Sequence, residues 1–182
     1  MLAKQQQFGF TLVELMVTVG VFVILASFAI PSFQEMVQNS KTRNAAESVH
    51  TGLQIARSEA VKRNTNVQFD FRGSNSAWTV CTSPATAGGC PSADNATTLE
   101  SRAMGEGSST DIAITATPAG PYVYSSLGVM VSPTPVAGLV KIEVKNSAAT
   151  SGRNLRVEIG TGGSIKVCDP QLTDANDPRK CS

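Results

Sequence analysis

Residues 10–30 read FTLVELMVTVGVFVILASFAI, and this apolar stretch decides what kind of protein the chain forms. Its length of about 21 residues is what a helix needs to cross a hydrocarbon core of roughly 30 Å. Glu14 is its only charged residue, and the stretch MLAKQQQFG before it holds one lysine and no acid. Because basic residues favour the cytoplasmic side, the pattern predicts one membrane-spanning helix with the remainder of the chain on the other side.

An ordinary secretory signal peptide fits this segment poorly. Such a signal has an apolar core of about 7–15 residues that is followed at once by a small-residue cleavage site. Here the apolar run is longer, and Ala26-Ser27-Phe28-Ala29 leads past Pro31 into a continuing helical pattern. We therefore expect a helix that stays attached to the chain, with a plain signal anchor as the alternative.

The composition excludes several classes of protein. The 182 residues are enough for one globular unit and an additional segment outside it. A net charge of +1 argues against a chain whose whole surface binds nucleic acid, and four cysteines with one histidine are too few for a His-rich zinc site. Only 5% of the residues are aromatic, so a stacking platform for single strands is not expected. The motifs of hydrolases and nucleotide-binding enzymes are missing, and we expect neither catalysis nor a cofactor.

The helical pattern continues past Pro31 but becomes amphipathic. Proline removes a backbone donor, so Pro31 is expected to bend the helix or to mark where its membrane part ends. Apolar residues then recur in steps of three and four, which is typical of a helix packed on one side. They are Phe33, Val37, Ala46, Val49, Leu53, Ala56 and Ala60. We predict one helix over residues 11–63, with its first half in lipid and its second half packed on a head.

From residue 64 onward the chain has the alternating pattern of strands. The clearest segment places Val140, Ile142 and Val144 on one face and charged residues between them. Strands are expected at 67–71, 77–81, 98–102, 111–115, 122–131, 140–145, 155–159 and 165–167. Each would have one core face and one solvent face, as antiparallel strands do. The fold class is therefore α+β: a long N-terminal helix packed on an antiparallel sheet or sandwich of about 115 residues.

The junction Gly9-Phe10-Thr11-Leu12-Val13-Glu14-Leu15 resembles the class III signal of type IV prepilins and type II secretion pseudopilins. The resemblance implies that residues 1–9 are a leader, which a membrane aspartyl peptidase removes after Gly9 on the cytoplasmic side. The new first residue, Phe10, would be N-methylated. Residues 10–31 would form the transmembrane and filament-core helix, residues 32–63 its amphipathic continuation and residues 64–182 a periplasmic head of type IV pilin-like fold.

Glu14 needs a separate explanation, because a carboxylate inside an apolar span costs roughly 2.5–3.5 kcal/mol. One interpretation is that it reaches the water at the membrane edge, since it lies about one helical turn from Phe10. The resemblance implies a second one. Glu14 would compensate the amino group of Phe10, mostly on a neighbouring subunit, and so set the axial position of each subunit during assembly.

Later segments are similar to the GspH/FimT group of minor pilins and pseudopilins. These are residues 54–60 with their passage into Asn64-Thr65-Asn66-Val67 and, more loosely, residues 123–128. The similarity implies a low-copy subunit that helps to initiate or cap a type IV pilus. Its partners would be other minor pilins and the major pilin, through the N-terminal helix, and its location the bacterial inner membrane and the filament. A pseudopilin of a type II secretion system is the alternative.

All four cysteines follow the membrane segment, so an oxidising periplasm would let them form disulfides. Four cysteines allow three pairings, and the sequence does not choose among them. Proximity along the chain favours Cys81 with Cys90 and Cys168 with Cys181. Neither spacing is that of a zinc or redox motif. The second loop is expected to hold the end of the chain in place, or else to contact a protein or a nucleic acid.

DNA binding is the other function to weigh. Some minor pilins of the FimT kind bind DNA through a Gly-Arg-x-Arg motif, and the matching place here is Gly163-Ser164-Ile165-Lys166, which lacks both arginines. A few phosphate contacts would still give weak, salt-dependent binding. The candidate residues are Lys141, Lys145, Arg153, Arg156, Lys166, Arg179 and Lys180. Ordinary solvation of a mixed-charge sheet explains the same residues, and we do not expect DNA to be the main partner.

Overall fold

The computed structural model describes residues 10–82, 89–91, 95–103, 105–106, 109–132, 139–148, 152–160 and 162–182. It contains two compact units, residues 1–37 and residues 38–182. Helix α1 (Leu12–Arg63) contributes residues to both. The strands of the second unit, called the head below, are β1 (Val67–Phe71), β2 (Trp78–Thr82), β3 (Thr98–Arg102), β4 (Ile112–Thr117), β5 (Tyr122–Tyr124), β6 (Met130–Ser132), β7 (Val140–Asn146), β8 (Leu155–Ile159) and β9 (Ile165–Cys168).

Helix α1 begins and ends where local chemistry favours it. At its start, the N–H of Glu14 donates to Oγ1 of Thr11 at 3.2 Å, which satisfies a backbone donor of the first turn. At its end, Asn64 adopts a left-handed conformation with φ of 51°, and the N–H of Thr65 donates to the carbonyl of Ala60. The predicted helix over residues 11–63 therefore agrees with the structure to within one residue.

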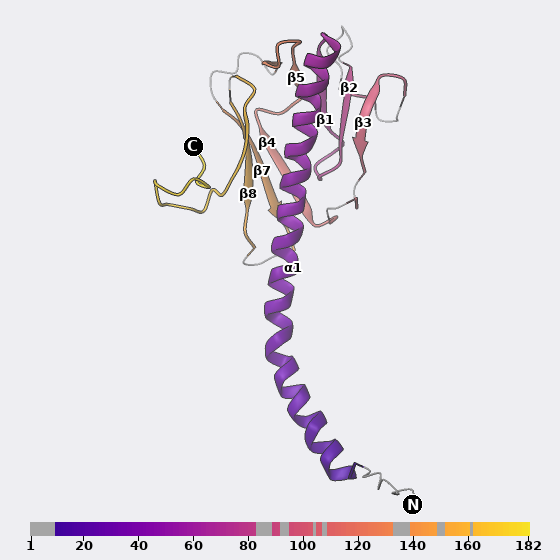
Figure 1. The fold of residues 1–182 in the computed structure, drawn as a ribbon, viewed down its shortest axis with the longest axis vertical. Helices are drawn as coiled ribbons and strands as arrows, with labels where there is room; N and C mark the ends of the chain where they lie inside the picture. The colour runs from indigo at the N-terminus through magenta and orange to yellow at the C-terminus, as the bar shows by residue number, and fades with distance from the viewer. Residues whose placement is uncertain are drawn as a thin grey trace, which may run out of the picture. The chain divides into compact units, whose positions relative to one another are not determined.

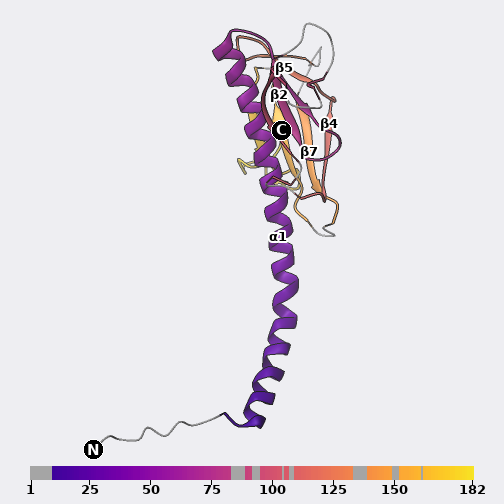
Figure 2. The same ribbon diagram turned by 90° about the vertical axis from the view of Figure 1, so that its right-hand side faces the viewer.

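The strands form two antiparallel sheets that the head part of α1 crosses (Figures 1 and 2). One sheet has five strands in the order β3-β2-β1-β5-β6, and the other has four in the order β4-β7-β8-β9. In Figure 1, β1, β2 and β3 lie on one side of the helix and β7 and β8 on the other. The α+β class and the antiparallel head predicted from the sequence are confirmed.

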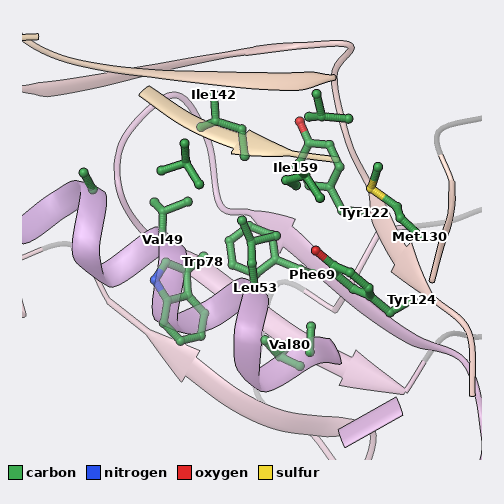
Figure 3. Packing of buried hydrophobic residues seen from close by; sticks show 14 of the residues in the cluster. Val49, Leu53, Phe69, Trp78, Val80, Tyr122, Tyr124, Met130, Ile142 and Ile159 are labelled. Atoms are coloured by element: carbon green, nitrogen blue, oxygen red, sulfur yellow. The ribbon is translucent and has the colours of Figure 1, made fainter. Parts of the chain in front are cut away.

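The core of the head forms between α1 and the inner faces of both sheets (Figure 3). Helix α1 contributes Val49 and Leu53, each fully buried, together with alanines. These small residues let the helix backbone approach the aromatic rings of the five-stranded sheet. The helix backbone lies close to two of these rings at Gly52. A Cβ at this position would be 2.7 Å from the Phe69 ring and 2.9 Å from the Trp78 ring. Trp78 is also held by its indole N–H, which donates to Ser48 at 3.0 Å.

The single strand expected over residues 122–131 is instead two antiparallel strands, β5 and β6, because the chain turns between them, where the Gly128 N–H donates to the carbonyl of Ser125. Two predictions about exposure are wrong as well. First, the strands are not uniformly exposed on one face, because Gln68, Thr79 and Glu158 are buried. The disulfide between Cys81 and Cys90 lies beside β1 and β2, and the end of the chain lies beside β8, so each covers part of an outer face. Second, Phe33 and Val37 belong to the apolar stripe of the helix by spacing but are exposed, because they lie in the first unit and the sheets begin to cover α1 only further along.

Candidate functional site

The first unit exposes a continuous apolar surface. Phe10 is 86% exposed and Phe28 is 78% exposed, and every large apolar side chain between them that the structure describes is also exposed. An 18-residue window of α1 has a mean hydropathy of 2.4, and none of that window is buried within the chain. By length and composition this segment can cross a membrane. An exposed apolar surface of this size marks a site of contact with lipid or with another protein.

Glu14 lies in the first turn of this helix. A carboxylate there interacts favourably with the positive end of the helix dipole. Among the described residues, the Glu14 side chain has no hydrogen bond or ion pair, although its backbone N–H donates to the Thr11 hydroxyl. Phe10 stands next to the helix start, and Gly9 lies outside the described residues. Helix α1 runs past Pro31 without a break in its assigned bounds, so a bend at Pro31 stays a prediction.

The cysteines pair as their proximity in the sequence favoured. The structure joins Cys81 to Cys90 and Cys168 to Cys181. The first bond holds the segment at residues 89–91 against β1, where the backbone N–H of Cys90 donates to Asp70 at 3.2 Å. Gly89 fits there because a side chain would collide with the same carboxylate. Burial raises the pKa of Asp70 above its ordinary value of 3.8.

The second disulfide closes a C-terminal ring, residues 168–181, which packs on β8 and β9. The two ends of the ring lie side by side in a parallel bridge between Asp169, the residue after β9, and Lys180. In it the Asp169 N–H donates to the carbonyl of Arg179 at 2.7 Å. Beneath it, the buried carboxylate of Glu158 accepts from the N–H of Ser182. The two sulfurs lie near Glu158, but they are bonded to each other and therefore do not offer thiolates to a metal ion.

Most of the basic residues considered for DNA binding already have partners. Arg156 pairs with Glu143 at 2.6 Å, and Arg153 pairs with the buried Asp169 at 2.9 Å. Arg179 pairs with Asp177, and the guanidinium lowers the pKa of that carboxyl to about 2. The remaining candidates are Lys166 and Lys180, whose ammonium groups donate to backbone carbonyls, and Lys141 and Lys145 on β7. These seven residues do not gather into one free basic patch.

Two features of the head have no signal in the sequence. At one end, the side chain of Arg57 donates to the carbonyl of Gly128 at 2.9 Å, and Gly163 lies so close to that carbonyl that a Cβ would be 2.4 Å from it. This contact joins α1 to loops of both sheets. The second feature is a groove of about 660 Å³. It is lined by Asn39, Ser40, Arg43, Glu47, His50, Arg153, Leu155, Ile165, Lys166, Val167, Cys168, Asp169 and Arg179.

Comparisons with known proteins identify the two parts of the chain. Residues 45–178 match the family model described as type II transport protein GspH, and residues 4–30 match the prokaryotic N-terminal methylation motif. The latter range includes Gly9, Phe10 and Glu14. The GspH match covers more than half of the chain, and together the two confirm the resemblance seen at residues 9–15.

Solved structures support the fold. The type IV minor pilin FimU of Pseudomonas aeruginosa is 17% identical, and the match covers 73% of this chain and 92% of FimU with a TM-score of 0.53. The minor pseudopilin EpsH from the Type 2 Secretion System of Vibrio cholerae is 14% identical over 72% of this chain and 99% of EpsH, with a TM-score of 0.49. At these identities, the likeness to FimU shows a shared fold of helix and antiparallel sheets.

Proposed function

The chain belongs to the GspH family of minor pilins and pseudopilins, and from this membership we propose that it is a minor pilin that helps to initiate or cap a type IV pilus. The role is structural rather than catalytic. The observation that carries the proposal is the first unit, where a methylation motif is followed by a helix whose apolar side chains are exposed. A helix that is retained after processing, and that the head does not cover, is suited to transfer from lipid into a bundle of other subunits.

We propose that processing cuts after Gly9 and methylates Phe10. Residues 10–31 then anchor the subunit in the inner membrane and later lie in the filament core. Residues 32–63 continue the helix, and residues 64–182, which hold the strands, lie in the periplasm. The disulfides support a head outside the cytoplasm, because such bonds persist in oxidising compartments. Partners would be other minor pilins and the major pilin, together with the prepilin peptidase and methyltransferase.

Glu14 would provide the selectivity of assembly. Its carboxylate has no partner among the described residues, and an acid in an apolar environment gains most from a fixed positive charge. The amino group of Phe10 on a neighbouring subunit supplies such a charge. Pairing the two would define how far each new subunit lies from the previous one along the filament axis.

The experiment is to replace Glu14 by leucine in the source organism and to measure subunit in the membrane and in sheared filaments. We expect Glu14→Leu to accumulate normally in the membrane and to be missing from the filaments. Glu35→Leu is the matched control, since Glu35 is exposed on the same helix but lies beyond the apolar stretch. Incorporation of Glu14→Leu at the wild-type level would contradict the proposal.

A type II secretion pseudopilin is the second candidate, and the description of the matching family model favours it. The two candidates predict different losses in a deletion strain. A pilus subunit is needed for twitching motility, whereas a pseudopilin is needed for export of folded proteins. Loss of exoprotein secretion with normal motility would replace the first candidate by the second.

A further inference from the structure

The groove of the head runs along a strand edge that is open. Strand β9 is last in its sheet, and among the described residues it pairs only with β8. The Gly160 N–H donates to the Ser164 carbonyl at 2.8 Å, so Ser164 and, by alternation, Lys166 turn their backbone groups toward β8. The backbone N–H and C=O groups of Ile165 and Val167 therefore point away from the sheet. An exposed edge of this kind is a template for another extended segment.

An isolated bridge shows that this edge accepts a backbone partner just past β9. The backbone groups of Asp169, the residue after β9, point to the same side as those of Ile165 and Val167. The Asp169 N–H donates to the carbonyl of Arg179 in the C-terminal ring. The ring thus occupies the edge just beyond β9. The edge of β9 itself has no such partner among the residues that the structure describes.

The side chains around the edge differ on its two faces. On the inner face, Leu155, Ile165 and Val167 are half-buried and apolar. Lys166 is exposed on the opposite face. A strand added to β9 would therefore present its own side chains alternately to an apolar surface and to a lysine.

Charge defines what should stand opposite that lysine. The groove carries four basic side chains and two carboxylates, and three of the basic groups already have acidic partners: Arg43 with Glu47, Arg153 with Asp169 and Arg179 with Asp177. Lys166 donates only to a backbone carbonyl among the interactions described. Lys166 stands opposite Glu158 in the register of β8 and β9, but that carboxylate lies near Arg156 and accepts from Ser182. Among the described residues Lys166 has no ion pair, and a carboxylate of the added strand would supply one.

We propose that the open edge of β9 is a docking site for an extended segment of another protein that alternates apolar with acidic residues. Backbone bonds to Ile165 and Val167 give affinity, the apolar face packs toward Leu155, and an acidic side chain pairs with Lys166. Duplex DNA fits this site less well, because Glu47 and Asp169 lie in it and most of its basic groups are neutralised. The inference concerns the head alone and does not depend on the assembly role of the N-terminal helix.

The test uses the full chain in detergent micelles and a short labelled peptide, capped at both ends, that alternates valine with aspartate. Fluorescence anisotropy measures its binding. We expect saturable binding to the wild type, and no binding of a peptide in which lysine replaces aspartate. A third peptide keeps the acidic sequence but carries an N-methyl group on every backbone amide, so that neither of its two edges can donate a hydrogen bond. It should not bind, because it lacks the backbone donors that edge pairing needs.

Two chain variants locate the contact. Lys166→Glu should weaken binding of the acidic peptide about threefold to tenfold, the size expected for reversing one cross-strand charge. Lys145→Glu, a lysine on β7 outside the groove, should bind as the wild type does. Hydrogen exchange should show new protection at Ile165 and Val167 when the peptide is bound.

Several results would overturn the proposal. They are no binding of the acidic peptide, equal binding of the N-methylated peptide, protection that appears away from β9, or binding of a labelled DNA duplex in place of the peptide. The comparison of peptides uses the wild-type chain only, so it tests the proposal even if the Lys166→Glu variant fails to fold. Failure here would leave the Glu14 experiment unaffected.

Discussion

The two halves of α1 both carry apolar side chains, but the first half exposes them and the second, amphipathic half buries them. In the first unit the helix carries large side chains all round, such as Phe22 at 70% exposed and Leu25 at 63% exposed. In the head the same helix carries alanines, Gly52 and a single leucine, Leu53, and these residues are fully buried against the sheets. Large apolar residues are left for an external partner, whereas small ones are used where the chain supplies its own partner.

The size and exposure of the apolar side chains fit a different role for each half. Small residues let the α1 backbone approach Phe69 and Trp78 closely, which fixes the head as one packed unit. The large exposed residues are the surface that, in the proposed function, contacts lipid first and neighbouring helices later. Burial of the small residues therefore stabilises the head, whereas the exposed large residues are the surface that the proposed assembly role requires.

The largest expected effect comes from shortening one leucine in each half. Leu53→Ala should lower the free energy of unfolding of the head by about 2–5 kcal/mol, because it leaves a cavity in the core. Leu25→Ala should leave that free energy unchanged. Urea unfolding in micelles, followed by the fluorescence of Trp78, measures both, since Trp78 is the only tryptophan and lies in the core. Equal losses in the two variants would mean that the head does not bury α1 as described.

Adding a methyl group to one glycine in each half has a smaller effect. At Gly52 the new Cβ would collide with the rings of Phe69 and Trp78, and overpacking of this kind costs about 1–3 kcal/mol. The gain in helix propensity from glycine to alanine, about 1 kcal/mol, offsets part of it. At Gly20 the Cβ would meet nothing within 4 Å among the described residues. We expect Gly52→Ala to lower the urea concentration at the unfolding midpoint and Gly20→Ala to leave it unchanged. The opposite result would contradict the claim that only the head half of α1 packs on the sheets.

The smallest effect is expected on the outer surface of the head part of α1. Glu59 accepts hydrogen bonds from Arg63 and Lys62, which lower its pKa below the ordinary 4.5. Its stabilising contribution is therefore present above that value and is lost as the pH falls below it. Glu59→Gln should cost less than about 1 kcal/mol at pH 7 and make acid unfolding slightly less steep. A larger loss at pH 7, measured by the same urea titration, would show that these ion pairs within α1 contribute more to stability than exposed pairs do.

The sequence predicts the elements of this protein better than their surroundings. Period-two alternation located β7, β8 and β9, and the three- and four-residue spacing located the buried stripe from Ala46 to Ala60. The exceptions depend on contacts between distant segments. Glu158 is on the alternating outer face of β8, yet it is buried because the last residues of the chain fold over it.

The residues that we propose to be functional differ in the same way, since some have a local sequence signal and others depend on long-range contacts. The junction around Glu14 is local and specific, so it was readable without a structure. The groove beside β9 was not, because it combines residues of α1, β8, β9 and the C-terminal ring. Gly163 shows the limit most clearly: in the sequence it stands at the place of a DNA-binding motif, whereas its positive φ and its close approach to the carbonyl of Gly128 explain the glycine.

The central claim is that the apolar first half of α1 is kept and reused for assembly. The most direct test is the intact mass and amino-terminal sequence of the native protein from purified membranes and from sheared filaments. The account predicts the same product in both, beginning at Phe10 and carrying one N-methyl group. A chain that begins beyond Ile30, or one that still begins at Met1 in the filaments, would contradict it.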